Sequence, residues 1–267
     1  MILYITIAIP HRRQEKKYSA NRYPYKNKMK KKYLLIIIGL LVISNSFSQK
    51  AYNKVFVLGN SLTQGFGTHG MASSDIDTDY FFKVKQAISE QNKPLEMTRF
   101  AGGYWERSTT SKMRKAFLRD SVATEINGRE DLILIQLGDN INSKDKRETL
   151  FKDIKKLLRW FTKKCPDAEI LWVYGWYGID DNMPIIKKAI STSKGCQLVD
   201  ISKYIRTKYK NKIGNTYRDK NGNISTIESR AVAGHPNDLG MSMIANEIIS
   251  GLGLNGDTKK SDSTKSQ

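Results

Sequence analysis

Short apolar stretches alternate with longer amphipathic stretches from residue 54 to residue 252. The short stretches are rich in Val, Ile and Leu, which is typical of parallel strands covered on both faces. We expect strands at residues 54–58, 95–100, 131–137, 169–174 and 196–201. The amphipathic stretches predict helices at about residues 79–91, 113–126, 146–164, 184–193 and 238–252. This alternation indicates an α/β fold with a parallel sheet between two layers of helices.

The pattern also predicts how the chain is divided. Residues 131–137 form the most apolar stretch, so we place that strand at the centre of the sheet. Residues 203–234 are polar and irregular, with a turn predicted at 219–222. Residues 255–267 have the composition of a disordered tail. We therefore expect one domain over residues 49–254.

The N-terminal region has the pattern of an export signal. Three lysines at 30–32 precede an apolar stretch at 33–43, and small serines follow up to Ser48. This order predicts a signal peptide over residues 29–48, too short in its apolar part for a membrane span. We interpret residues 1–28 as an over-extended start. The mature protein is then expected to be secreted or periplasmic, with no stable membrane span after cleavage.

Charge and cysteine content exclude some classes. The formal charge is +19, and residues 1–32 hold ten basic residues against one acidic residue, so they account for +9 of it and leave +10. The remaining lysines are scattered and form no nucleic-acid-binding motif, so we expect no nucleic-acid partner. Two cysteines, Cys165 and Cys196, are too few for a disulfide framework or a cysteine metal site. Whether they are bridged or free stays open, as does the oligomeric state.

Polar groups follow three of the predicted strands where each one ends. Ser61 comes after the first strand, Gly102 and Gly103 after the second, and Asn140 after the third. The carboxyl ends of parallel strands meet at one edge of the sheet, where α/β proteins bind ligands. His235 stands directly before the last predicted helix. These are the groups that acyl transfer needs.

Their chemical roles follow from residue type. A serine is a weak nucleophile until a base takes its proton, and a neutral histidine is the usual base. The tetrahedral intermediate carries a negative oxygen that preorganised donors stabilise. His69 is a rival base in the glycine-rich loop after Ser61, but such a loop positions a base poorly.

The four blocks Gly59-Asn60-Ser61-Leu62, Gly102-Gly103, Gly138-Asp139-Asn140 and His235-Pro236-Asn237 resemble the conserved blocks of the SGNH (GDSL-like) hydrolase superfamily. Residues 65–74 and Asp238-Leu239-Gly240-Met241 resemble its exported bacterial subset. The resemblance implies a flavodoxin-like three-layer sandwich with a five-stranded parallel sheet. It also implies esterase or deacetylase activity without a metal or other cofactor. Ser61 would be the nucleophile and His235 the base. The oxyanion hole would be the N–H of Ser61, the N–H of Gly102 or Gly103, and the side chain of Asn140.

Two positions depart from the superfamily pattern. Asn60 stands where Asp is common, and Val232 stands where the acid of the triad usually lies, three residues before His235. The imidazole is then oriented either by a backbone carbonyl or by an acid from elsewhere. The candidate acids are Glu228, Asp238 and Glu106, although Asp238 is also placed to cap the last helix. A third alternative is a pseudoenzyme that keeps the pocket without the rate.

Aromatic side chains suggest the class of substrate. We expect four residues to rim the pocket: Trp105, Glu106, Trp176 and Tyr177. Aromatic rings there can stack on a sugar face, so the preferred substrate is a small acetyl-like ester, most simply on carbohydrate. The alternatives are a lipid esterase and a non-catalytic carbohydrate-binding protein on the same fold.

Overall fold

The computed structural model describes residues 50–65, 69–91, 93–179, 181–219 and 221–254. The expectations for residues 1–28, 29–48 and 255–267 lie outside this part of the chain. Within the described ranges, no helix is long and apolar enough to cross a membrane.

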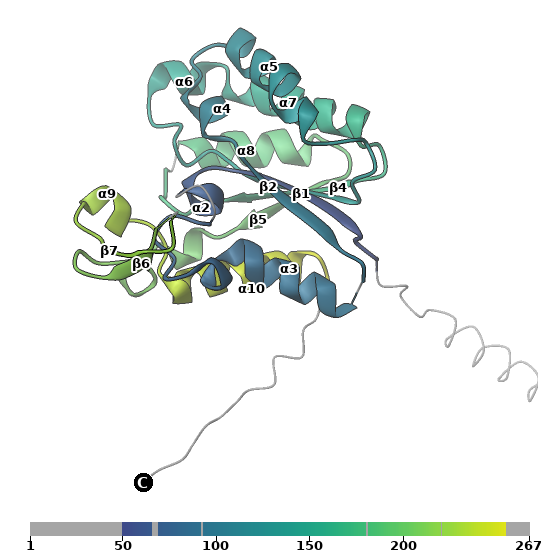
Figure 1. The fold of residues 1–267 in the computed structure, drawn as a ribbon. Helices are drawn as coiled ribbons and strands as arrows, with labels where there is room; N and C mark the ends of the chain where they lie inside the picture. The colour runs from purple at the N-terminus through teal and green to yellow at the C-terminus, as the bar shows by residue number, and fades with distance from the viewer. Residues whose placement is uncertain (1–49, 66–68, 92, 180, 220, 255–267) are drawn as a thin grey trace, which may run out of the picture. The chain divides into compact units, whose positions relative to one another are not determined.

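Five parallel strands form one sheet in the order β2-β1-β3-β4-β5 (Figure 1). The strands are β1 (Lys54–Gly59), β2 (Glu96–Ala101), β3 (Leu132–Gln136), β4 (Glu169–Tyr174) and β5 (Cys196–Asp200). The predicted α/β fold with a five-stranded parallel sheet is confirmed, and β3 lies at its centre as its apolar sequence predicts. Each strand is within about one residue of its predicted range.

Helices precede, follow and connect these strands. Their bounds are α2 (Ser61–Gln64), α3 (Tyr80–Gln91), α4 (Gly103–Arg107), α5 (Ser111–Asp120), α6 (Lys144–Glu148), α7 (Leu150–Lys164), α8 (Asn182–Ser191), α9 (Arg230–Ala233) and α10 (Asp238–Gly251). Short 3₁₀ turns are η1 (Ile76–Thr78), η2 (Val122–Thr124), η3 (Ser202–Tyr204) and η4 (Thr207–Tyr209). The helix predicted at 113–126 is wrong beyond Asp120, where the chain turns into η2. The helix predicted at 146–164 is divided at Thr149 into α6 and α7.

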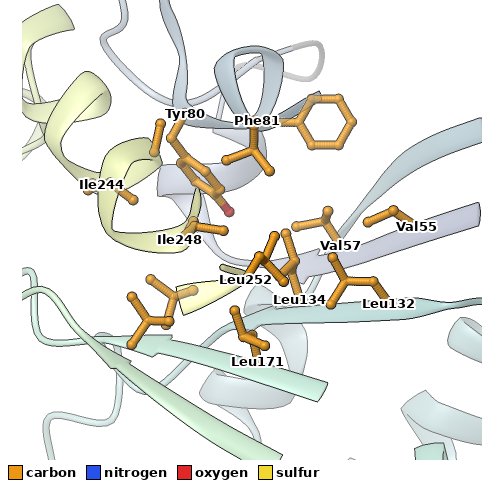
Figure 2. Close-up of a cluster of buried hydrophobic side chains, with 14 of the residues drawn as sticks. Val55, Val57, Tyr80, Phe81, Leu132, Leu134, Leu171, Ile244, Ile248 and Leu252 are labelled. Carbon is orange, nitrogen blue, oxygen red and sulfur yellow. The ribbon is translucent and has the colours of Figure 1, made fainter. Parts of the chain in front are cut away.

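Alternate residues of β1 point to opposite faces of the sheet. Val55 and Val57 join a core cluster with α3 and α10 (Figure 2), whereas Phe56 and Leu58 join a second cluster with α5, α7 and α8. Figure 1 shows these two groups of helices on the two sides of the sheet. Each fully buried Leu or Ile contributes about 1.5–3 kcal/mol relative to an exposed one, so the sheet is anchored from both sides.

Helical spacing explains which side chains are buried. The apolar stripe of α7 consists of Leu150, Ile154, Leu157, Leu158 and Phe161, all buried. In α3, the inner positions are Tyr80, Phe81, Val84 and Ile88. Phe82, next to the inner Phe81, is instead 39% exposed. At 100° per residue it lies about 200° around the axis from Val84, which turns it towards solvent.

The polar region at 203–234 contains more regular structure than its sequence indicates. β6 (Thr216–Arg218) and β7 (Ile224–Thr226) pair as an antiparallel hairpin. The carboxylate Oδ1 of Asp219 accepts the N–H groups of Asn221 and Asn223, which closes the predicted turn. The strands are three residues long and half exposed, so they lack the apolar alternation that predicts a strand.

Both cysteines are free thiols. Cys165 is buried and donates to Oε2 of Glu130 at 3.1 Å, and Cys196 begins β5. The structure therefore has no disulfide bond between Cys165 and Cys196.

Candidate active site

The end of β1 presents Ser61 at the carboxyl edge of the sheet. Asn60 caps the short helix α2, because its side-chain oxygen accepts the N–H of Leu62 at 3.0 Å. Ser61 is the first residue of that helix. A Cβ on Gly59 would lie 1.7 Å from Oγ1 of Thr63, so only glycine permits this sharp change from strand to helix.

Ser61 and His235, 174 residues apart in sequence, are brought within hydrogen-bond distance. Oγ of Ser61 lies 2.8 Å from Nε2 of His235. The other ring nitrogen, Nδ1, lies 3.0 Å from the carbonyl oxygen of Ala231 and 3.2 Å from that of Val232. A carbonyl can only accept, so Nδ1 carries the proton and Nε2 is left to accept one from the serine.

The carbonyls that hold His235 come from the end of a helix. Ala231 and Val232 lie at the end of α9, where carbonyl groups are left over by the helix ladder, and the Val232 carbonyl also accepts the N–H of His235 at 3.0 Å. These carbonyls orient the imidazole in place of an acidic side chain, which the sequence lacks at Val232. Burial lowers the pKa of His235 to about 4, and the two carbonyls only partly oppose this effect. The imidazole is therefore neutral at physiological pH, as a base must be.

The acids considered for His235 lie elsewhere. Glu228 is exposed. The two oxygens of Asp238 accept the N–H and the hydroxyl of Ser74, at 2.9 and 2.5 Å. The expectation that Asp238 caps the last helix is wrong, because Asn237 is the N-cap residue and accepts the N–H of Gly240 at 2.9 Å. In the described part of the chain, the hydrogen bonds of Nδ1 go to main-chain oxygens alone.

The two glycines after β2 differ in the use of their N–H groups. Gly102 donates its N–H to the carbonyl of Gly59 at 2.6 Å, as a continuation of the β1–β2 pairing. This bond removes Gly102 from the expected oxyanion donors. Gly103 begins α4, and Ser61 begins α2. The first N–H groups of a helix have no partner within it and are suited to an anion.

Asn140 is tied to a buried acid. Its side-chain nitrogen Nδ2 donates to Oε2 of Glu106 at 2.7 Å. The other oxygen of Glu106, Oε1, accepts three further bonds: from Nδ2 of Asn60 at 3.2 Å, from the N–H of Gly138 at 2.6 Å and from the N–H of Asn140 at 3.2 Å. Glu106 thus joins the ends of β1 and β3 to helix α4.

The expectation that Glu106 rims the pocket is wrong, because its side chain is fully buried. Burial raises the pKa of Glu106, and the hydrogen bonds from Asn140, Gly138 and Asn60 counteract it. Sequence reasoning had no means of separating this residue from an exposed helical glutamate. The one available signal is its place three residues after a strand-ending Gly-Gly pair.

Two of the expected aromatic rim residues are also buried. Trp105 is 0% exposed and packs edge-on against Trp172, with ring centroids 6.4 Å apart. Trp176 is 0% exposed, and its Nε1 donates to the carbonyl of Gly234 at 3.0 Å. Large rings at strand ends bury more apolar area by folding back over the sheet than by facing water. The bond to Gly234 ties Trp176 to the main chain one residue before His235.

Tyr177 is the rim residue that lies beside the serine–histidine pair. Its ring meets that of His235 edge-on, with centroids 5.6 Å apart, and Ser61 is a hydrogen-bond partner of its side chain. Burial raises the pKa of its hydroxyl. The N–H of Tyr177 donates to Oδ1 of Asp139 at 3.2 Å.

Asp139 is a second buried carboxyl group, which sequence reasoning left without a role. Its Oδ2 accepts Nε2 of Gln136 at 2.8 Å. Burial, followed by the charge of Glu106, raises the pKa of Asp139 to about 7. Two acids therefore lie beneath the carboxyl edge of the sheet.

His69, the rival base, is buried, and burial lowers its pKa. The serine hydroxyl faces His235 and not His69. In the described ranges, no group of three or more His, Cys, Asp or Glu side chains is arranged to hold a metal ion.

Comparison with known proteins adds evidence on the fold. No family model matches the chain. A search of curated proteins also found no match. Among solved structures, a two-domain esterase active on acetylated mannans, co-crystallised with mannopentaose, has 18% identity and a TM-score of 0.50; the match covers 80% of this chain and 52% of that one.

Two smaller proteins match over nearly their whole length. A GDSL-like lipase candidate from Parabacteroides merdae has 16% identity and a TM-score of 0.50, with 78% of this chain and 98% of that one covered. A family 3 carbohydrate esterase from Clostridium thermocellum has 12% identity and a TM-score of 0.50, with 74% and 94% covered. The chain spans about half to two thirds of the length of the larger carbohydrate esterases it matches. These neighbours belong to the class of esterases and lipases built on the SGNH-type sandwich, and the chain shares that fold.

Proposed function

We propose that this protein is an SGNH-type serine esterase that hydrolyses small acetyl-like esters, with carbohydrate as the preferred alcohol part. The observation that carries the proposal is the 2.8 Å contact between Oγ of Ser61 and Nε2 of His235, with Nδ1 fixed by two carbonyls. Nucleophile, base and orienting group are the three parts that covalent acyl transfer requires. Here the orienting part belongs to the main chain.

The reaction follows from the positions of these groups. His235 takes the hydroxyl proton as Oγ of Ser61 attacks the ester carbonyl. The resulting oxyanion accepts hydrogen bonds from the N–H groups of Ser61 and Gly103 and from Nδ2 of Asn140. His235 then passes the proton to the leaving alcohol, and an acyl-serine remains. Water attacks the acyl-serine, gives a proton to His235, and releases the acid with Ser61 regenerated.

The choice of carbohydrate as the alcohol rests on one aromatic side chain and one structural neighbour. Two of the aromatic rings expected to stack on a sugar are buried, so Tyr177 is the ring that supports this choice. A structural neighbour acts on acetylated mannans. Export of the protein, which would bring it to such polymers, stays part of the proposal.

The purified full chain should hydrolyse p-nitrophenyl acetate, and Ser61→Ala should abolish this activity without changing the melting temperature by more than a few degrees. Hydrolysis that survives Ser61→Ala would rule out the mechanism. A folded wild-type protein without hydrolysis that still binds acetylated oligosaccharide would instead support the non-catalytic alternative. Faster hydrolysis of long-chain than of acetyl esters would favour a lipid esterase.

A further inference from the structure

Glu106 occupies an unusual position for a carboxylate. It is fully buried, it has no cationic partner among the ion pairs of the described residues, and it is surrounded by N–H donors. All four of its donors come from segments that end at the candidate active site. An ionised carboxylate can only accept hydrogen bonds, so every group around it is forced to present a hydrogen.

This requirement decides which way round the Asn140 amide stands. An asparagine side chain carries an acceptor oxygen and a donor nitrogen of nearly the same shape. Because Oε2 of Glu106 lies 2.7 Å away and accepts, the nitrogen must face Glu106. The second hydrogen on that nitrogen remains for another acceptor.

We infer that Glu106 is a positioning residue that fixes the Asn140 amide so that its nitrogen, and not its oxygen, faces the developing oxyanion. This inference rests on the proposed esterase function. With the amide reversed, Oδ1 of Asn140 would face the oxyanion and repel it, and the hydrogen bond from Nδ2 would be lost. Glu106 acts through Asn140 and does not itself touch substrate.

Glu106→Gln tests the inference with little change in shape. The NH₂ group of the glutamine would face an N–H donor at either oxygen position of Glu106. Reversal of the Asn140 amide, which turns its oxygen towards this NH₂ group, relieves the conflict at the lowest cost. We expect kcat for p-nitrophenyl acetate to fall about 100-fold or more, as when one oxyanion donor is lost, with KM changed less than about threefold. Asn140→Ala should cause a similar loss of kcat.

The double variant separates positioning from general damage. If Glu106 acts through Asn140, Glu106→Gln adds little to Asn140→Ala, and the two losses do not multiply. Glu130→Gln is the matched control, because Glu130 is also buried and also accepts two main-chain N–H groups, from Asn127 and Gly128, but bonds none of the site residues. Losses that multiply, or a Glu106→Gln rate equal to that of Glu130→Gln, would overturn the inference.

The side-chain amide signals of Asn140 provide a readout that needs neither hydrolysis nor a stable variant. In the wild-type protein, the proton held by Glu106 should resonate well downfield of its geminal partner. Two amide protons at ordinary positions would contradict the inference even if the enzyme is active. Absence of wild-type hydrolysis, by contrast, defeats the proposed function and leaves the amide geometry to be decided by this spectrum.

A second, independent observation concerns a groove between α5 and α7, on the α5, α7 and α8 side of the sheet. It has a volume of about 500 Å³. Four exposed cations line it: Lys115, Lys156, Arg159 and Lys163. The buried Arg114 and Asp153 in its wall bond each other at 2.6 Å. Lys156 lies 3.5 Å from Asp153, and the other three exposed cations form no ion pair with a described carboxylate.

Three of the four cations are arranged in a row, with apolar side chains beside them. Lys156, Arg159 and Lys163 follow one face of α7 at spacings of three and four residues, about 10 Å from first to last. Half-buried Trp160 and buried Leu118 contribute apolar surface beside them. One cation per helical turn, next to a flat ring, matches a chain of sugar rings that each carry a negative group.

We propose that this groove binds a carboxylated oligosaccharide, as a site separate from Ser61. A nucleic acid is disfavoured because single-stranded sites use several exposed rings in succession, whereas Trp160 is the one ring of this groove that solvent reaches. The proposal does not depend on hydrolysis, because binding can be measured with Ser61→Ala.

Binding of oligogalacturonate to the full chain can be followed by calorimetry. We expect binding that weakens with salt and is absent for a neutral cello-oligosaccharide. Lys115→Gln with Lys163→Gln should weaken it about tenfold, whereas Lys85→Gln with Lys93→Gln, at the same change of charge in and just after α3 across the sheet, should not. Equal weakening by both pairs, no binding, or tighter binding of single-stranded DNA of equal charge would overturn the proposal.

Discussion

The side-chain nitrogen of Asn60 lies 3.2 Å from Oε1 of Glu106, while the oxygen of the same amide accepts the N–H of Leu62 at 3.0 Å. One end of the side chain must donate and the other must accept. An amide meets both needs at any pH, whereas an ionised Asp could only accept, which favours Asn at this position. The amide of Asn60 therefore complements the buried carboxyl group of Glu106.

Asn60→Asp should destabilise the fold, because it places two carboxyl groups in contact in a buried site. We expect a loss of roughly 3 kcal/mol in the free energy of unfolding at pH 8 and less at pH 5, where one carboxyl can hold a proton. Urea unfolding at both pH values measures this. Asn142→Asp, at an exposed position, is the control and should change little. Equal stability of Asn60→Asp and wild type at pH 8 would show that the carboxylates are not in contact.

Sequence patterns predicted those parts of the site that lie at strand ends. Ser61, the Gly102-Gly103 pair and Asn140 follow from the rule that parallel strands end at one edge, whereas His235 was singled out by its residue type and its place before the last helix. The roles of Glu106 and Asp139 did not follow. Whether an acid is solvated or buried depends on packing between segments distant in sequence, and neither hydropathy nor spacing records it. The same limit explains why Trp105 and Trp176 were expected at the rim.

Ser61 and His235 should act as a unit. Removal of the base leaves the hydroxyl un-ionised, so His235→Ala is expected to reduce kcat about as severely as Ser61→Ala. The double variant should be no slower than either single one, because the second substitution removes an already broken function. Steady-state rates with p-nitrophenyl acetate for the three variants test this. A mild effect of His235→Ala, or a further loss in the double variant, would mean that another base serves Ser61.

The activity should persist at unusually acid pH. The base must be neutral, and burial lowers the pKa of His235 to about 4. The value of kcat/KM should therefore stay close to its maximum at pH 5.5 and fall to half of that maximum near pH 4. A histidine of ordinary pKa would be only about one tenth neutral at pH 5.5. Val232→Asp adds a negative charge three residues before His235 and should raise the pH at which kcat/KM falls to half. A wild-type kcat/KM that falls to half near pH 6.5 would contradict the expectation.

Two buried groups should make the free energy of unfolding depend on pH in opposite directions. Folding lowers the pKa of His235 from 6.5 to about 4, so the unfolded chain takes up a proton as pH falls through this range and stability is lost. Folding raises the pKa of Asp139 from 3.8 to about 7, so the unfolded chain releases a proton as pH rises and stability is also lost. Glu106, whose pKa is also raised, adds to the trend of Asp139.

Single variants should expose each trend. Relative to wild type, Asp139→Asn should gain stability as pH rises from 4 to 7, and His235→Gln should lose it over the same range. Each change should amount to a few kcal/mol, because one pKa unit corresponds to about 1.4 kcal/mol. Urea titrations at intervals of half a pH unit measure both, and subtraction of the wild-type curve removes the contribution of all other groups. A flat difference curve would show that the substituted group has the same pKa in the folded as in the unfolded chain, and a curve of the opposite sign would show that its pKa is shifted the other way.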